Sequence, residues 1–484
     1  MASVAASRTR DGPRQGFLYR RLAAELRTQI EQGVLRIGDR LPSVRTLRRL
    51  HKVNAGTATA AYVVLEREGY VEARERSGFY VTRRPATQPP AILKPSYAPA
   101  RVDVGELVSA VLRRSDDRLI PLGISSLGPE LLPNARLNRA VRRAIARQPA
   151  HSASYGALVG VPELRRELAR LLIHSGVACG PEDLIVTAGG LEALNLALRA
   201  ITRPGDVVAV ESPTYFGVLQ AIEALGLRAV EVPSDPRRGV DLALLERALR
   251  RHRARGAIVM TTSHNPLGCV MSDSAKQELV SLVTRLGVAL IEDDVYGDLA
   301  YGEARPRPAK AFDRNGHVML CSSVSKTLAP GLRVGWIVPG RYRLRVELVK
   351  SVTSMLTSAL PQLTLAELLE SGFYPRYIRR LRHKVADQVG QYASAAESLF
   401  PDGTRVTRPA GGKVLWVQLA GPLDGTALYR RALEKGVSIM PGEIFSLGRR
   451  HRRFVRISCG HPWSERIERG ITELARLAGS GRRA

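Results

Sequence analysis

Residues 322–336 read SSVSKTLAPGLRVGW and set one lysine, Lys326, among small hydroxyl residues directly after the apolar run HVMLC. Arginine supplies most of the 73 basic residues and only nine are lysine, so few positions offer an amine for lysine-specific chemistry. An amine whose pKa is lowered by its surroundings can condense with an aldehyde, and hydroxyl and guanidinium groups bind phosphate. The stretch therefore predicts attachment of pyridoxal 5'-phosphate at Lys326, with Ser323 and Arg333 near the phosphate.

Other motifs supply the groups that this cofactor needs around its ring. In LIEDDVYGDL, Asp293 ends an apolar run and Tyr296 follows three positions later, so a carboxylate and a phenol would reach neighbouring edges of one ring. Asp293 would keep the pyridine nitrogen protonated, and with Lys326 it forms the predicted catalytic pair. Tyr215 in ESPTYFG is the candidate for stacking on the ring, and Asn265 in HNPLG is the candidate for contacting the phenolic oxygen.

A pair of glycines is the predicted cradle for the phosphate. TAGGLEAL places Gly189 and Gly190 where a predicted strand meets a predicted helix. The backbone N–H groups and the dipole at a helix N-terminus attract anions, and glycine lets the backbone approach them closely. The motif thus complements the hydroxyl and guanidinium groups around Lys326.

Short apolar runs alternate with helical stretches through most of the chain after residue 118. These runs are DLIVTAGG, DVVAVESP, RAVEVPSD, AIVMTTSHNP, VALIEDDVY and HVMLCSSVSK. Such alternation is typical of an α/β domain whose largely parallel sheet is covered on both faces. We expect this domain at 119–484, after a linker at 85–118 that begins rich in proline.

The N-terminal segment, 14–84, has a different pattern. Apolar residues recur at helical spacing in 18–32, and Ser43 and Asn54 are suitable N-caps for two further short helices. YVEARE and FYVTRR, with a turn at Ser77 and Gly78, predict a β-hairpin. Three helices followed by a hairpin are the order of a winged helix-turn-helix.

Composition narrows the possible partners and location. The net charge is +28, and the first 85 residues hold seventeen basic against eight acidic residues, which favours a polyanion as partner. The four cysteines lie far apart without metal-ligand spacing, so neither a metal site nor a disulfide framework is indicated. No apolar run approaches the roughly 20 residues that span a bilayer, and the N-terminus lacks an apolar signal core. We therefore expect a cytoplasmic protein with no membrane partner.

The N-terminal segment closely resembles the GntR family of bacterial regulators over residues 18–81. The matching stretches are LRIGDRLPSVRTLRRL, AYVVLEREGYVEAR and SGFYV. We expect the first exposed residues of the third helix to be Asn54, Ala55, Gly56, Thr57 and Thr59, and the resemblance implies that this helix enters the major groove of double-stranded operator DNA. By the same resemblance, the DNA contacts would come from Arg45, Asn54, Thr57, Ser77 and Gly78. The alternative is that the arginines form the solvated face of a protein-binding module.

The remainder, about 119–475, resembles the fold type I aminotransferases, which are pyridoxal-phosphate-dependent transferases with a large α/β domain and a smaller C-terminal α+β subdomain. SASYGALVGVPELRREL resembles the segment whose tyrosine reaches the phosphate in the partner subunit's site. This resemblance nominates Tyr155 and implies a homodimer. FVRISCG resembles the late strand whose arginine pairs with a substrate's α-carboxylate, which nominates Arg456 as the substrate or effector residue.

The fusion of the two parts resembles the MocR subfamily of GntR-type transcription regulators. It implies a head-to-tail homodimer in which pyridoxal phosphate on Lys326 senses a small amine, an amino acid or the cofactor itself. Two alternatives stay open at this point. The chain could be an active aminotransferase with a regulatory DNA-binding module, or an aminotransferase whose N-terminal domain binds only protein.

Overall fold

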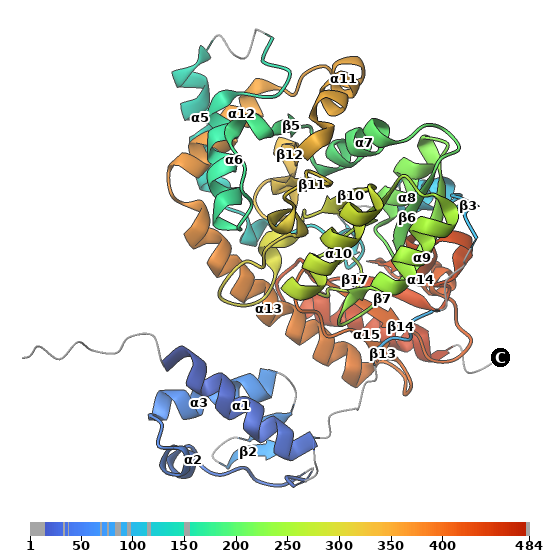
Figure 1. The fold of residues 1–484 in the computed structure, drawn as a ribbon. Coiled ribbons are helices and arrows are strands. Elements are labelled where there is room, and N and C mark those ends of the chain that lie inside the picture. The colour runs from blue at the N-terminus through green and yellow to red at the C-terminus, as the bar shows by residue number, and fades with distance from the viewer. Residues whose placement is uncertain are drawn as a thin grey trace, which may run out of the picture. The chain divides into compact units, whose positions relative to one another are not determined.

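The computed structural model describes residues 15–31, 34–36, 38–67, 70–74, 77–82, 89–93, 98–113, 118–149 and 155–480. The chain divides into two compact units, Met1–Thr87 and Gln88–Ala484 (Figure 1). The boundary expected between residues 84 and 85 lies outside the described residues. Within the described ranges, no helix is both long and apolar enough to cross a bilayer.

The first unit is a winged helix-turn-helix, as predicted. Its elements are α1 (Gln15–Glu31), α2 (Val44–His51), α3 (Ala55–Arg67), β1 (Val71–Arg74) and β2 (Gly78–Val81). Both predicted caps are confirmed, because Ser43 Oγ accepts the N–H of Thr46 at 3.1 Å and Asn54 Oδ1 accepts the N–H of Thr57 at 2.7 Å. Each bond satisfies a backbone donor that the first helical turn leaves free.

The core of this unit lies where the three helices and the hairpin meet. Leu22 and Leu26 of α1 pack with Leu47 of α2 and with Tyr62 and Leu65 of α3. The hairpin is antiparallel, with Val71 opposite Val81 and Arg74 opposite Gly78. The second strand also bonds to the loop before α2, since the N–H of Leu41 donates to the carbonyl of Phe79 at 2.8 Å. The loop therefore holds the wing beside the helices.

The second unit is built on a nine-stranded sheet in the order β3-β7-β6-β9-β10-β11-β12-β5, with β8 paired to β7. The strands are β3 (Ala100–Arg101), β5 (Ile185–Thr187), β6 (Val207–Ser212), β7 (Arg228–Asp235), β8 (Gly239–Val240), β9 (Gly256–Val259), β10 (Ala289–Asp293), β11 (Val318–Ser323) and β12 (Gly335–Val338). Neighbours from β7 through β11 are parallel, and β3, β5, β8 and β12 add antiparallel pairs. The predicted largely parallel sheet is confirmed.

Helices cover both faces of this sheet (Figure 1). The helices that contact its strands most extensively are α7 (Gly190–Ile201), α8 (Phe216–Ala224), α9 (Leu242–His252) and α10 (Asp273–Leu286). The second unit also contains α4 (Gly105–Arg113), α5 (Asn134–Arg147), α6 (Pro162–His174), α11 (Arg343–Thr353) and α12 (Ala359–Glu370), which contact other helices. Adjacent strand residues enter different cores: Ile258 packs in one hydrophobic cluster, and Ala257 and Val259 pack in the other. This alternation explains why each strand reads as a continuous apolar run.

A smaller antiparallel sheet, in the order β13-β14-β17-β16, confirms the predicted C-terminal α+β subdomain. Its strands are β13 (Arg405–Val406), β14 (Val414–Gln418), β16 (Met440–Pro441) and β17 (Phe454–Ser458), and its helices are α13 (Tyr374–Leu399), α14 (Gly425–Glu434) and α15 (Glu465–Gly479). Strand β15 (Val437–Ser438) pairs in parallel with β4 (Ile120–Pro121). This pairing connects the segment before α5 with the smaller C-terminal subdomain.

Candidate functional site

The candidate site lies at the carboxyl ends of two adjacent parallel strands. Asp293 is the last residue of β10 and Ser323 the last of β11, and Asp293 pairs in register with Cys321. A single 3₁₀ turn, Val324–Lys326, follows β11 and carries the predicted attachment lysine. Parallel strands present their carboxyl ends at one edge of a sheet, where ligands bind in open α/β folds.

A cavity of about 150 Å³ opens at this edge. Eight of the residues predicted from the sequence line it, namely Gly190, Tyr215, Asn265, Asp293, Tyr296, Ser323, Lys326 and Arg333. They come from segments spread over more than 140 positions of the chain. Only the fold brings them together, and it does so around one small space.

The amine of Lys326 lies beside the phenol of Tyr296. Lys326 Nζ is 5.7 Å from the centroid of the Tyr296 ring and donates to the carbonyl oxygen of Ser125 at 3.2 Å. The Tyr296 hydroxyl donates to Ser125 Oγ at 2.9 Å. Ser125 is therefore a site residue that sequence reasoning missed, because GISSLG contains no signal that separates this buried serine from the next one.

The carboxyl group of Asp293 lies in the floor of the cavity and is 1% exposed. Burial raises the pKa of Asp293 to about 6, although the N–H of Val295, which donates to Oδ1 at 3.2 Å, and the charge of Lys326 act in the opposite direction. Among the described residues no cation donates a hydrogen bond to this carboxyl, which therefore favours the binding of a protonated nitrogen. That is the group which the pyridine ring would present to it.

The glycine pair and Arg333 form a cradle at the other end of the cavity. A Cβ atom on Gly189 would lie 2.5 Å from Arg333 Nη2, and one on Gly190, the first residue of α7, would lie 2.7 Å from Val295 Cγ1. Larger residues at 189 and 190 would thus collide with the wall of the cavity. Arg333 donates to Ser325 Oγ at 3.2 Å and to the carbonyl of Ala188 at 3.3 Å. A guanidinium next to a helix N-terminus fits a phosphate group.

Arg456 approaches from the smaller sheet and reaches the cavity through Asn265. Its Nη1 donates to Asn265 Oδ1 at 3.1 Å, and its Nη2 donates to the carbonyl of Gly123 at 2.7 Å. The guanidinium is buried, and its Nε has no hydrogen-bond partner in the described part of the chain. Three of the predicted cofactor and effector residues do not line the cavity, namely Gly189, Tyr155 and Arg456, and the side chain of Tyr155 is 88% exposed.

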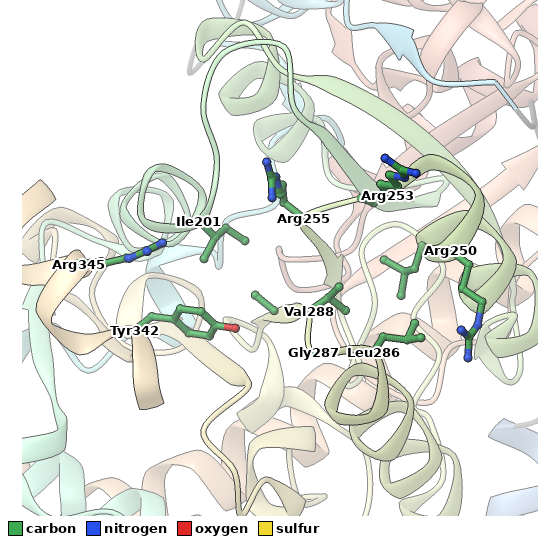
Figure 2. Close-up of a pocket in the computed structure, with 12 residues that line it drawn as sticks. Ile201, Arg250, Arg253, Arg255, Leu286, Gly287, Val288, Tyr342 and Arg345 are labelled. Atoms are coloured by element: carbon green, nitrogen blue, oxygen red, sulfur yellow. The ribbon is translucent and has the colours of Figure 1, made fainter.

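A larger cavity, of about 380 Å³, lies at the opposite edge of the sheet, where Ala289 begins β10 (Figure 2). Arginines surround its apolar floor, and two of them are already paired: Arg250 with Glu246 at 2.9 Å and Arg255 with Asp206 at 3.2 Å. It contains none of the predicted residues. The cavity at the carboxyl ends of the strands is therefore the candidate site.

The first unit presents a basic surface at α2, which precedes the N-terminal end of α3. The side chains of Arg45, Arg48 and Arg49 are exposed and form no ion pair within the described residues. Asn54 and Gly78 are exposed as well, whereas Ser77 is half-buried, with its hydroxyl 2.6 Å from that of Tyr80. Unpaired arginines beside the N-terminal end of a helix suit contacts with DNA phosphates.

The expectation that Thr57 is exposed is wrong, because its side chain is 8% exposed. Thr57 lies one helical turn before Ala61, whose side chain is fully buried in the core of the unit. The apolar stripe of α3 is therefore wider than the sequence suggested, and its buried side extends to the first turn. The neighbouring Thr59 is exposed.

Two family models match the chain. Residues 18–81 match the gntR family of bacterial regulatory proteins, and residues 126–474 match aminotransferase class I and II. An uncharacterized HTH-type transcriptional regulator of Escherichia coli, YdcR, is 37% identical over 460 residues, which are 95% of this chain and 98% of that protein. The probable rhizopine catabolism regulatory protein MocR of Rhizobium meliloti is 28% identical over 88% of this chain and 86% of its own length.

Solved structures resemble the second unit. The crystal structure of the α-aminoadipate aminotransferase LysN from Thermus thermophilus matches with a TM-score of 0.72 and 29% identity, over 77% of this chain and 94% of that one. The kynurenine aminotransferase of Pyrococcus horikoshii matches with the same TM-score, 27% identity, and coverage of 78% and 95%. The chain therefore belongs to the MocR-type transcriptional regulators, in which a GntR helix-turn-helix domain is fused to a domain of aminotransferase class I and II.

Proposed function

We propose that the aminotransferase-like domain binds pyridoxal 5'-phosphate at Lys326, senses a small amine or amino acid there, and thereby alters the DNA affinity of the helix-turn-helix domain. The observation that carries this proposal is the cavity itself. It combines an amine, a buried carboxyl and an anion cradle at the same edge of the sheet. When bound, the cofactor would supply an aldehyde that reacts reversibly with primary amines.

Different residues of the chain would attach the cofactor, orient its ring and bind its charged groups. Lys326 would hold the aldehyde, and Asp293 would pair with the protonated ring nitrogen. Tyr296 and Asn265 would contact the phenolic oxygen, and Tyr215 would stack on the ring. At the phosphate, the contacts would come from Gly189, Gly190, Ser323 and Arg333.

Arg456 would bind the carboxylate of an amino-acid effector, because its guanidinium is buried and keeps one donor free. Tyr155, exposed in its own chain, would reach the phosphate of a second copy. We therefore also propose a head-to-tail homodimer, with residues 85–118 linking the DNA-binding domain, 14–84, to the sensing domain, 119–484. At the operator, the contacts would come from Arg45, Asn54, Ser77 and Gly78.

An effector acts on DNA binding only if the states that bind DNA differently also bind the effector with different affinity. The test loads the full chain with pyridoxal phosphate and titrates amino acids and amines while recording visible absorbance and the affinity for operator DNA. We expect at least one compound to shift both. The proposed regulation of DNA binding is refuted if compounds shift the absorbance of the cofactor-loaded protein but none of them changes its affinity for DNA.

A second candidate is aminotransferase activity, which the joint presence of Lys326, Asp293 and Arg456 around one cavity favours. The same titration distinguishes the two, since an active enzyme converts the amino acid to its keto acid with turnover. A sensor releases the amino acid unchanged.

A further inference from the structure

A second lysine, Lys413, lies behind the candidate site. It directly precedes β14, and its side chain is 0% exposed. Lys413 Nζ is 5.4 Å from the centroid of the Tyr296 ring, close to the 5.7 Å that separates the same ring from Lys326 Nζ. Its one hydrogen bond within the described residues goes to the carbonyl of Lys326, at 3.4 Å. Lys413 is thus a buried amine beside the cavity that has one long hydrogen bond.

The other fully buried lysines are better satisfied. Lys350 lies 3.4 Å from a carboxylate oxygen of Glu192 and also donates to Thr357 at 3.1 Å. Lys276 donates to Thr262 at 2.9 Å and to the carbonyl of Arg307 at 2.7 Å. Their contacts identify them as structural. Lys413 lacks comparable partners, although a buried ammonium has three protons to share.

Arg456, like Lys413, has no anionic partner among the described residues. It donates to an amide and to a backbone carbonyl, its Nε is unpartnered, and no carboxylate pairs with it or with Lys413 in the described part of the chain. Burial lowers the pKa of Lys413 well below its usual range, and the charges of Lys326 and Arg456 lower it further. Buried basic groups carry a stable charge only when an anion pairs with them, so this arrangement favours an anionic ligand that would raise the pKa of Lys413 again.

We propose that Lys413 and Arg456 together select amino acids with an acidic side chain, Arg456 binding the α-carboxylate and Lys413 the distal carboxylate. The inference rests on the proposed function and deepens it by naming the class of effector. Lys413 is then the residue that determines specificity. A dicarboxylic amino acid brings two negative charges to a place where two buried basic groups have no carboxylate partner among the described residues, and its distal carboxylate would favour the protonated form of Lys413.

The test compares L-glutamate with L-glutamine and L-aspartate with L-asparagine, as ligands of the cofactor-loaded full chain in a calorimetric titration. The wild-type chain should bind the acids about tenfold or more tightly than the amides, as charge-assisted hydrogen bonds warrant. In Lys413→Met this preference should fall to about one. Lys435→Met, which alters an exposed lysine of the same subdomain, should keep it.

A melting experiment without amino acid tests the same idea independently of the ligand. Lys413→Met replaces a buried amine, which has only one long hydrogen bond among the described residues, by an apolar side chain of similar length. This should raise the melting midpoint, whereas Lys435→Met should leave it nearly unchanged. A lower midpoint for Lys413→Met would overturn the inference, because it would reveal a structural partner of the ammonium.

Equal affinity of the wild type for acids and amides, a preserved preference in Lys413→Met, or no binding of any of the four amino acids would also overturn it. The proposed function fails on different evidence. It fails if the wild-type chain gains no visible absorbance with pyridoxal phosphate, or if no compound changes its DNA affinity.

Discussion

Asp293→Asn should stabilise the cofactor-free chain at neutral pH. The carboxyl of Asp293 is fully buried and carries its charge only against a desolvation penalty that raises its pKa to about 6. Asparagine has nearly the same shape, and its oxygen can still accept the N–H of Val295, which donates to Asp293 Oδ1 at 3.2 Å. The substitution therefore removes the charge and keeps the local geometry.

The magnitude follows from proton linkage. The folded chain holds the proton of Asp293 more tightly than the unfolded chain, whose pKa is near 3.8. The contribution of Asp293 to stability is thus fully present below about pH 4 and is lost as the pH rises through about 6. The loss amounts to about 3 kcal/mol at pH 7 and about 1 kcal/mol at pH 4.5, since one pKa unit corresponds to about 1.4 kcal/mol.

Urea unfolding, followed by tryptophan fluorescence from pH 4.5 to 7.5, measures this difference. The three tryptophans, Trp336, Trp416 and Trp463, all lie in the second unit, so the signal reports that unit alone. We expect the free energy of unfolding of Asp293→Asn to exceed that of the wild type at pH 7 and to approach it at pH 4.5. The exposed Asp402→Asn is the control and should show no such gap.

With pyridoxal phosphate bound, the wild type should be more stable than Asp293→Asn, because only the wild-type carboxylate can pair with a protonated ring nitrogen. A gap that is independent of pH, or a wild type more stable than Asp293→Asn at pH 7 without cofactor, would refute the reasoning. Either result would mean that the carboxylate already has a strong partner in the folded chain.

The other predictions concern single side chains. Lys326→Ala should abolish the visible absorbance of the loaded chain, and an unchanged spectrum would disprove attachment at this residue. Arg45→Ala should weaken operator binding about tenfold and lower the salt dependence by about one phosphate contact, as gel shifts at several salt concentrations would measure; Arg21→Ala, on α1, should change neither. Arg456→Ala should weaken amino-acid binding by about tenfold or more in calorimetry and leave amines without a carboxylate unaffected, and equal losses for both would point to misfolding.

Predictions from local patterns were confirmed where the interaction that forms the element lies within a single short segment. Ser43 and Asn54 cap their helices because a side-chain oxygen needs only the N–H three residues later. Five of the six apolar runs form parallel strands whose two faces are covered, and the first run forms β5, which pairs antiparallel with β12. Asp293 and Ser323 end two adjacent parallel strands and Lys326 follows the second of them, so the three residues meet at the edge where these strands end.

The sequence by itself therefore determined the two domains, the parallel sheet and most residues around the cavity. Only the tertiary structure decided the burial of Thr57 and the positions of Ser125 and Lys413 next to Lys326. Ser125 meets Lys326 across 201 positions, and Lys413 meets it across 87. The physical reason is that burial and the choice of hydrogen-bond partners depend on which distant segments pack together, and no local pattern of residues contains that information.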